Sequence, residues 1–427
     1  MDMTFHGVSS LRGQVEVPPD KSISHRAAIL GALAEGETVA RPFLRSGDCL
    51  STLNCLRELG INWKLEDDAL TIEGHGPEAF RQPHDVLDAG NSATTMRFLA
   101  GVLAGRSFES VITGDESLRT RPMGRIIEPL RRMGAEITGS EDGTKPPLRI
   151  KGGPLHGIEH LMEVDSAQVK SALMLAGLQA DSETTIIGGR SSRDHTERML
   201  LLMGAELSFG DDAITIKKSS LESREIAIPG DMSSASFLIA ASVVIPGSRL
   251  LLKNVGLNPT RAGFLSVLNS MGALIIEANY QEMDNEPRGD LKVSGTQLSG
   301  IELEGWRVPA MIDEVPLLAV IGCMARGTTT VRGAGELRVK ESDRIAAICT
   351  ELRKMGARID ELPDGFSIQG PNKLRGTQVD SHGDHRIAMA LAVAALCAEA
   401  ETAISGWECV DISFPGFDQV LMSLQGM

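Results

Sequence analysis

Three short clusters in this sequence combine cations, hydroxyl groups and carboxylates, and each coincides with a helix-start signal. They lie at residues 19–26, 340–344 and 384–386. A helix N-terminus carries unpaired N–H donors and about half a positive charge, so it favours phosphate and carboxylate groups. Lysine adds a compact point charge, and arginine adds a two-pronged donor for the same anions. The clusters therefore predict a site for small anionic ligands.

Two carboxylates stand among or close to these cations. Asp313 precedes a run of apolar residues, and Glu341 lies between Lys340 and Arg344. A carboxylate in an anion site is a candidate for proton transfer. Pairing with a neighbouring arginine is the structural alternative, and for any single charged residue a solvated surface position also remains open. The predicted site therefore depends on the recurrence of the clusters.

The overall composition argues against large anionic partners. The 427 residues carry a formal net charge of −15, and only 4% of them are aromatic. An acidic surface repels nucleic acid and anionic membranes, and the scarcity of aromatic residues leaves few platforms for stacking bases. We expect small-molecule substrates, no nucleic-acid or membrane partner, and a monomer of two or three domains.

No signal points to export, a metal or a cofactor. The first residues lack the basic and apolar regions of a signal peptide, so we expect a cytoplasmic protein. The six cysteines form no C-x-x-C pair and are expected to be free, buried thiols. His382 and His385 lack further ligands nearby, and the P-loop, H-E-x-x-H and ribose-binding glycine motifs are missing, so neither metal nor cofactor is predicted.

A short motif, in which glycine ends a predicted helix, recurs along the chain. Successive glycines are separated by 68 residues (Gly204 to Gly272) to 84 residues (Gly272 to Gly356), and each follows apolar residues at helical spacing. About forty residues upstream of each glycine lies a helix start with a capping side chain. The glycines are Gly60, Gly134, Gly204, Gly272, Gly356 and, more weakly, Gly426; the helix starts are near Asp20, Asn91, Ser166, Ser233, Asp313 and Asp384.

The segments between these markers predict one α/β block used six times. After each glycine comes a hairpin-like stretch, as at residues 205–216, where Gly-Asp-Asp separates two alternating runs. Proline-containing crossings at residues 17–20 and 228–231 enclose three repeats. We therefore predict a continuous domain of residues 21–230 and a discontinuous domain of residues 1–20 plus 231–427, joined by a hinge, with the site in the cleft between them. An open solenoid is the alternative.

Six blocks of this sequence together resemble the signature motifs of the 5-enolpyruvylshikimate-3-phosphate synthase family, in the same order and over essentially the whole chain. They are residues 19–26, 90–97, 121–125, 166–171, 340–344 and 384–389. The resemblance implies an inverse α/β fold of two domains, each with three βαβαββ-type units. It also implies transfer of the enolpyruvyl group from phosphoenolpyruvate to the 5-hydroxyl of shikimate 3-phosphate, through a tetrahedral intermediate.

By the same resemblance, each cluster receives a role. The phosphate of phosphoenolpyruvate would contact Lys21, Arg121 and Gln168, and its carboxylate Arg344 and Arg386. The carboxylate of shikimate 3-phosphate would contact Ser22 and Arg26, and Lys21 would contact the same substrate. Its phosphate would contact Ser166, Ala167, Gln168, Arg193 and Lys340, with Thr94 close by. Asp313 would bind the ring hydroxyls and act as the base, while Glu341, with Lys21 as a second candidate, would handle the proton at the methylene carbon.

Two positions depart from the family's pattern. Ala93 stands where many members have glycine, and an added methyl there is associated with insensitivity to glyphosate, so we expect weak inhibition. Ile412 stands where some members carry a lysine, and no role is transferred to it. Two other functions remain as alternatives: the sister enolpyruvyltransferase that acts on UDP-N-acetylglucosamine, and a non-catalytic anion-binding module. Residues 115–122 lack the cysteine that the sister enzyme usually presents.

Overall fold

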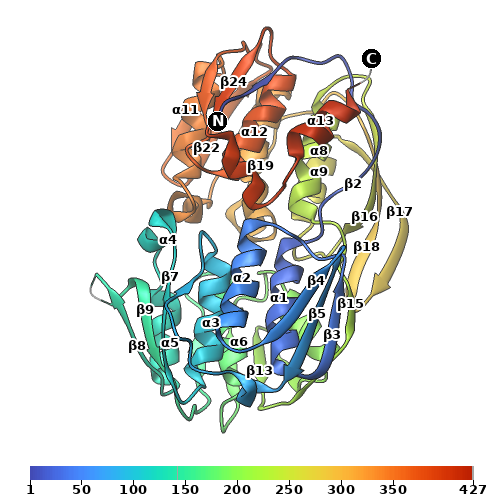
Figure 1. Cartoon of the computed structure of the whole chain (residues 1–427). Helices are drawn as coiled ribbons and strands as arrows, with labels where there is room; N and C mark the ends of the chain where they lie inside the picture. The colour runs from blue at the N-terminus through green and yellow to red at the C-terminus, as the bar shows by residue number, and fades with distance from the viewer. Residues whose placement is uncertain (142, 426–427) are drawn as a thin grey trace. The chain divides into compact units, whose positions relative to one another are not determined.

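The computed structural model describes residues 1–141 and 143–425. The chain divides into two compact units (Figure 1). Unit 1 contains residues 1–18, 229–282 and 287–427, and unit 2 contains residues 19–228 and 283–286. Each unit has a hydrophobic core of its own, so each is described separately.

Unit 2 is built from three repeats of helix, strand, helix and hairpin. Its helices are α1 (Lys21–Leu33), α2 (Gly47–Glu58), α3 (Ala93–Ala104), α4 (Glu116–Thr120), α5 (Gly124–Arg132), α6 (Ala167–Gly177) and α7 (His195–Leu202). Its strands are β3 (Ala34–Arg41), β4 (Asn62–Glu66), β5 (Ala69–His75), β6 (Leu87–Asp88), β7 (Glu109–Thr113), β8 (Glu136–Ser140), β9 (Lys145–Lys151), β10 (Glu159–Leu161), β11 (Thr184–Ile187), β12 (Leu207–Phe209), β13 (Ala213–Ile216), β14 (Leu221–Glu222) and β15 (Glu225–Ala227).

Unit 1 repeats this order. Its helices are α8 (Met232–Val244), α9 (Gly263–Ser270), α10 (Val315–Met324), α11 (Arg344–Lys354), α12 (His385–Leu396) and α13 (Phe417–Leu424). Its strands are β1 (Met3–Phe5), β2 (Arg12–Glu16), β16 (Arg249–Gly256), β17 (Leu274–Met283), β18 (Glu286–Ser294), β19 (Glu302–Leu303), β20 (Gly327–Val331), β21 (Ile359–Leu362), β22 (Gly365–Gly370), β23 (Gln378–Asp380) and β24 (Thr402–Ser405). The junction of β17 and β18, residues 283–286, belongs to unit 2.

The sheets confirm the repeat and its α/β class. In the order β10-β11-β13-β12, β11 pairs in parallel with β10, and β12 and β13 form the predicted hairpin of residues 205–216. The same order recurs in β6-β7-β9-β8 and β19-β20-β22-β21. Strands close in sequence form these hairpins, whereas each parallel pair needs a crossover through a buried helix.

Three sheets are completed by strands from distant parts of the chain. β14 and β15 pair with β3, and β2 pairs with β16, all in parallel. The sixth repeat has no hairpin among the described residues; β1 pairs with β24 in its place. Our expectation of six equivalent blocks is therefore corrected at the last repeat, and its marker Gly426 lies outside the described residues.

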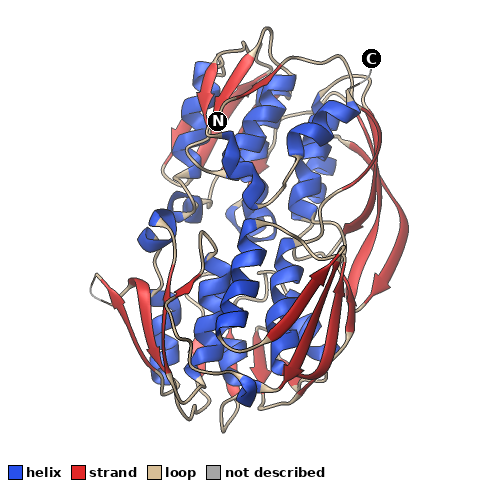
Figure 2. Cartoon of the chain, in the orientation of Figure 1, coloured by secondary structure: helices blue, strands red, loops and turns tan. Residues whose placement is uncertain are grey.

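The first helix of each repeat lies inside its unit, and the strands lie at the periphery (Figure 2). All residues of α8 and α12 are buried, as expected for helices that are apolar on every side. Within unit 2, α3 and α6 pack so closely that a Cβ added at Gly101 would lie 2.2 Å from the carbonyl oxygen of Ala172. This close packing holds α3 and α6, and with them their N-termini, next to each other.

The helix ends confirm the glycine pattern. The second helix of each of the first five repeats is followed, two positions after its last residue, by a glycine with φ between 85° and 113°: Gly60, Gly134, Gly204, Gly272 and Gly356. This left-handed backbone costs glycine little because it has no Cβ.

One expected feature of the helix starts is wrong. Asp20, Ser92, Ser166, Asp231 and Asp384 cap their helices through the side chain. Glu314 precedes α10 without a capping side-chain bond, because the 3-10 helix Pro309–Glu314 runs directly into α10. No helix in residues 1–141 and 143–425 is both long and apolar enough to span a membrane.

Candidate active site

In unit 2, three inner helices present their N-termini with predicted site residues at the first positions. Lys21 begins α1, Ala93 begins α3 and Ala167 begins α6. A chain of hydrogen bonds joins the first two starts: His25 contacts Thr52 at 2.7 Å, and Thr52 contacts Thr95 at 2.7 Å. Thr95 Oγ1 in turn donates to the capping Ser92 at 2.8 Å. Buried hydrogen bonds therefore fix where Lys21 and Ala93 lie relative to each other.

Lys21 carries its charge next to a carboxylate that the sequence did not single out. Its Nζ lies 3.0 Å from Oδ2 of Asp48, near the start of α2, and both side chains are largely buried. This ion pair holds the ammonium group at the start of α1. Burial and the neighbouring cations Lys21 and Arg26 lower the pKa of His25 well below its usual value, so this histidine is neutral at pH 7.

Arg26 is buried in a polar pocket between α1, α6 and α7. Its Nε donates to Thr196 at 2.6 Å, and Nη2 donates to Ser171 at 3.0 Å. The ring of Phe98 lies 4.8 Å from its Cζ, which adds a cation–π contact. Burial lowers the pKa of Arg26 to about 10, so the guanidinium remains charged at neutral pH.

Gln168 contacts both Thr94, another predicted site residue, and the cation Arg97. Its Nε2 donates to Thr94 Oγ1 at 2.7 Å, and its Oε1 accepts from Arg97. Arg97 also donates to the carbonyl of Pro122 at 3.1 Å, next to Arg121. These contacts link the starts of α3 and α6 with the segment before α5.

The remaining predicted site residues of unit 2 lie at or near helix starts and differ in how far they are buried. Arg121 is buried and donates to Asn91 at 3.0 Å. Ser166 caps α6 by accepting from the N–H of Val169. Ser22 and Arg193 are half-buried, at the start of α1 and just before α7.

In unit 1, Arg344 lies at the centre of a carboxylate cluster. It is 1% exposed and contacts Asp384 at 2.7 Å, Asp313 at 3.2 Å and Glu341 at 2.5 Å. Burial alone would lower the pKa of this guanidinium, but the three carboxylates raise it above its usual value. Arg344 is therefore permanently charged, and it orients both predicted proton-transfer residues.

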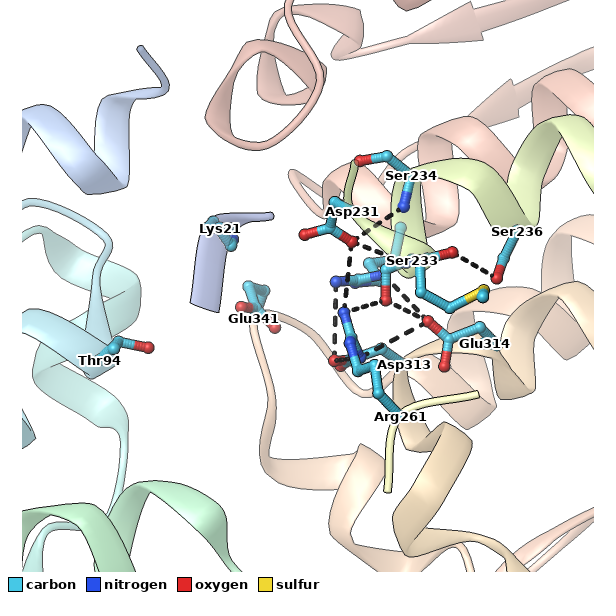
Figure 3. A network of polar contacts seen from close by, with 12 residues as sticks. Lys21, Thr94, Asp231, Ser233, Ser234, Ser236, Arg261, Asp313, Glu314 and Glu341 are labelled. Carbon is cyan, nitrogen blue, oxygen red and sulfur yellow. Dashed lines mark hydrogen bonds and ion pairs between the residues drawn. The ribbon is translucent and has the colours of Figure 1, made fainter. Parts of the chain in front are cut away.

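Asp313 faces three arginines. Arg344 lies 3.2 Å from Oδ1, while Arg261 and Arg386 lie 3.5 Å and 3.6 Å from Oδ2. Figure 3 shows Asp313 beside Arg261 and Glu314 in this network. The carboxylate is held on both oxygens, so its position and orientation are defined by the fold.

Glu314 is a fully buried carboxylate behind Asp313. Its Oε1 accepts from Ser233 and lies 3.8 Å from both Arg261 and Arg386. Arg261 and the role of Glu314 were missed from the sequence, since only the helix-start signal marked residue 314. Arg261 had no local signal, because it lies after β16 and reaches Asp231 and Asp313 through tertiary packing.

The structure brings the predicted residues together as two groups, one in each unit. Unit 1 holds Asp313, Lys340, Glu341, Arg344 and Arg386, with Lys340 half-buried just before Glu341. Unit 2 holds Lys21, Ser22, Arg26, Ala93, Thr94, Arg121, Ser166, Ala167, Gln168 and Arg193.

Neither a thiol nor a metal cluster adds chemistry in the described part of the chain. The six cysteines are free, and burial raises the pKa of Cys55, Cys323 and Cys397 to about 12. Such thiols stay protonated at pH 7 and are poor nucleophiles. Residues 1–141 and 143–425 contain no group of three or more His, Cys, Asp or Glu that could hold a metal ion.

Known proteins match this chain over nearly its full length. A family model described as EPSP synthase (3-phosphoshikimate 1-carboxyvinyltransferase) matches residues 5–421. The chain belongs to the EPSP synthase family. Proteins named 3-phosphoshikimate 1-carboxyvinyltransferase from Desulforudis audaxviator and Syntrophomonas wolfei are each 52% identical to it, over 100% and 97% of both chains. A protein of the same name from Shouchella clausii is 49% identical over 98% of this chain and 97% of its own.

Solved structures agree with the EPSP synthase fold. The EPSP synthase from Acinetobacter baumannii superposes with a TM-score of 0.88 at 39% identity, covering 99% of this chain and 98% of that chain. The enolpyruvyl transferase NikO from Streptomyces tendae has a TM-score of 0.79 at 17% identity, covering 99% of this chain and 96% of that one, which shows a shared fold. The predicted family and the repeated α/β fold are thus confirmed, and an open solenoid is excluded.

Proposed function

We propose that this chain transfers the enolpyruvyl group of phosphoenolpyruvate to the 5-hydroxyl of shikimate 3-phosphate and releases inorganic phosphate. The product, 5-enolpyruvylshikimate 3-phosphate, leads to chorismate and the aromatic amino acids. The observation that carries the proposal is Asp313, held by Arg261, Arg344 and Arg386 in a chain that is about half identical to enzymes of this name.

Phosphoenolpyruvate binds through its two anionic ends. Lys21, Arg121 and Gln168 hold its phosphate, and Arg344 and Arg386 hold its carboxylate, while Ala93 limits the space beside it. The arginines suit this task because a guanidinium donates two parallel hydrogen bonds to a carboxylate. Arg344 enters the reaction already oriented by Asp384, which contacts two of its nitrogens.

Shikimate 3-phosphate binds across the other residues. Ser22 and Arg26 hold its carboxylate. Asp313 accepts hydrogen bonds from the ring hydroxyls. The residues around its phosphate are Thr94, Ser166, Ala167, Gln168, Arg193 and Lys340. The N-terminus of α6 adds backbone N–H donors and a partial positive charge at this phosphate.

The reaction is an addition followed by an elimination. Glu341, with Lys21 as a second candidate, delivers a proton to the methylene carbon of phosphoenolpyruvate, and C2 becomes electrophilic. Asp313 takes the proton of the 5-hydroxyl as its oxygen attacks C2, giving a tetrahedral ketal phosphate. Removal of a methyl proton then restores the double bond and expels phosphate. Only carboxylates and cations are required, and the reaction consumes no oxidant or metal.

The cations serve catalysis as well as binding. Two highly charged substrates repel each other, and positioned lysines and arginines bring them together against this repulsion. Because Arg26, Arg121, Arg344 and Arg386 are buried, little reorganisation of these groups is needed when charge moves during the reaction. The proposal requires the residues of units 1 and 2 to act on the same pair of substrates, as two domains of one enzyme. We further propose a cytoplasmic monomer.

Phosphate release with both substrates tests the proposal, with mass-spectrometric detection of the enolpyruvyl product and a parallel assay in chelator. Turnover with shikimate 3-phosphate that survives the chelator supports it. Turnover only with UDP-N-acetylglucosamine would favour the sister reaction. Ligand binding without any product would favour a non-catalytic module.

A further inference from the structure

We infer that Lys170 and Glu197, which are not among the proposed substrate contacts, form the internal ion pair that positions the binding site for shikimate 3-phosphate in unit 2. This inference rests on the proposed function. Lys170 lies on α6 and is completely buried, with its Nζ 2.6 Å from Oε1 of Glu197 on α7. Glu197 is itself 4% exposed.

The ammonium group of Lys170 also organises the turn before α7. It donates to the carbonyl oxygens of Gly189 at 3.1 Å and Ser192 at 3.3 Å. Ser192 closes the same turn by donating from its hydroxyl to Gly189 at 2.6 Å. An ammonium group has three protons, and these three acceptors match them in number. The turn is therefore built around a buried cation.

Each segment that the pair touches carries a proposed contact to shikimate 3-phosphate. Lys170 follows Ser166 and Gln168 on α6, and the turn that it holds leads directly into Arg193. Glu197 follows Thr196, whose hydroxyl accepts from Arg26 at 2.6 Å. The pair thus connects the proposed phosphate contacts to the proposed carboxylate contact.

The cost of burying this pair argues for a positioning role. Taking two charges out of water costs more than an apolar pair of the same volume, so a buried ion pair alone is weak evidence for stability. Here an apolar replacement would fill the space but would take the ammonium donor away from the carbonyl of Ser192 and leave the carbonyl of Gly189 with one donor fewer. Lys170 and Glu197 are positioning residues, since they act on the substrate through Arg193, Arg26 and the start of α6.

The test compares Lys170→Met/Glu197→Gln with Glu197→Gln, because both lack the buried negative charge. The expected result for the double variant is a KM for shikimate 3-phosphate at least tenfold above that of Glu197→Gln. Its kcat and its KM for phosphoenolpyruvate, measured at saturating shikimate 3-phosphate, should stay within threefold of the values for Glu197→Gln. Lys253→Met/Asp290→Asn, which removes an ion pair in unit 1, is the matched control. It should lower the unfolding temperature without raising the KM for shikimate 3-phosphate relative to the KM for phosphoenolpyruvate.

A folded double variant whose KM for shikimate 3-phosphate stays within twofold of Glu197→Gln would overturn the inference, as would an equal rise in both KM values. If the methionine prevents folding, Lys170→Gln/Glu197→Gln is judged by the same criteria, because its two amides can bond to each other. The wild-type arm separates the two proposals: no turnover there would refute the proposed function, whereas an active wild type with an unaffected variant refutes only the positioning role.

Discussion

Arg344 and Asp313 form an ion pair in which Nη1 lies 3.2 Å from Oδ1. The same guanidinium contacts Glu341 through Nη2. One buried arginine therefore sets the positions of both carboxylates that we propose for proton transfer. Residues 313 and 341 are far apart in the sequence, so their geometry depends on this shared partner.

Arg344→Lys should impair the reaction although it conserves charge. A lysine is a single point of charge and cannot hold Asp313, Glu341 and Asp384 in the geometry of the arginine. We expect kcat to fall by about 100-fold and KM for phosphoenolpyruvate to rise about tenfold, in line with losses of a few kcal/mol at such sites. Steady-state kinetics measures both, and Arg358→Lys at an exposed position is the control. Near wild-type values would contradict the role of Arg344.

Asp313→Asn should keep the fold and lose turnover. The amide has nearly the shape of the carboxylate but cannot accept the proton of the attacking hydroxyl. A general base contributes typically about 10²- to 10⁴-fold, and kcat should fall by that factor. Phosphate release measures kcat, and circular dichroism reports the fold, with the half-buried Asp364→Asn as the control. A kcat within threefold of wild type would remove Asp313 as the base.

Glu341→Gln separates catalysis from binding. We expect kcat to fall by at least about 100-fold, because an amide cannot exchange a proton with the methylene carbon. The Kd for shikimate 3-phosphate, measured by calorimetry, should stay within about threefold, equivalent to less than 0.7 kcal/mol. Glu361→Gln, another partner of an arginine, serves as the control. Unchanged turnover in Glu341→Gln would rule out its proton-transfer role.

Ala93→Gly should make the protein more sensitive to glyphosate. Ala93 is 6% exposed at the first position of α3, and we propose that its methyl narrows the space beside phosphoenolpyruvate. Glyphosate is slightly longer than phosphoenolpyruvate, so it should clash with this methyl group before phosphoenolpyruvate does. One methyl in a pocket is worth roughly 1–3 kcal/mol, so the inhibitory concentration should fall about 10- to 200-fold. Ala104→Gly, at the other end of α3, should leave it unchanged. Equal potency against wild type and Ala93→Gly would refute the steric explanation.

His25 should make stability depend on pH. Its pKa is lowered by burial and by the cations Lys21 and Arg26, so below about pH 6.5 the unfolded chain binds a proton that the folded chain does not. The free energy of unfolding should then fall as the pH falls, by about 1.4 kcal/mol per unit for this group. Above that pH the group contributes no slope.

Urea denaturation between pH 8 and 5 measures this effect. The difference in unfolding free energy between wild type and His25→Gln should be constant above about pH 6.5 and shrink below it. The exposed His75→Gln should follow the wild-type curve. Parallel curves for wild type and His25→Gln would show that this histidine does not carry the pH dependence.

The sequence by itself determined the local features of this protein. Helix starts at Asp20, Ser92, Ser166 and Asp384, and the left-handed glycine ends, were predictable because capping bonds and backbone sterics involve residues only a few positions apart. The motifs at residues 19–26 and 340–344 indicated the family for the same reason: each is a local arrangement of residue types.

Only the tertiary structure decided which distant groups meet. It paired Lys21 with Asp48, placed Arg261 and Glu314 beside Asp313, and buried Lys170 against Glu197. It also replaced the sixth hairpin with β1 from the other end of the chain. The residues in each of these contacts are far apart in the sequence, so no local pattern predicts that they meet. A buried charge needs an opposite charge and a strand edge needs a neighbouring strand, and the packing of the helices and sheets determines which residue or strand is close enough.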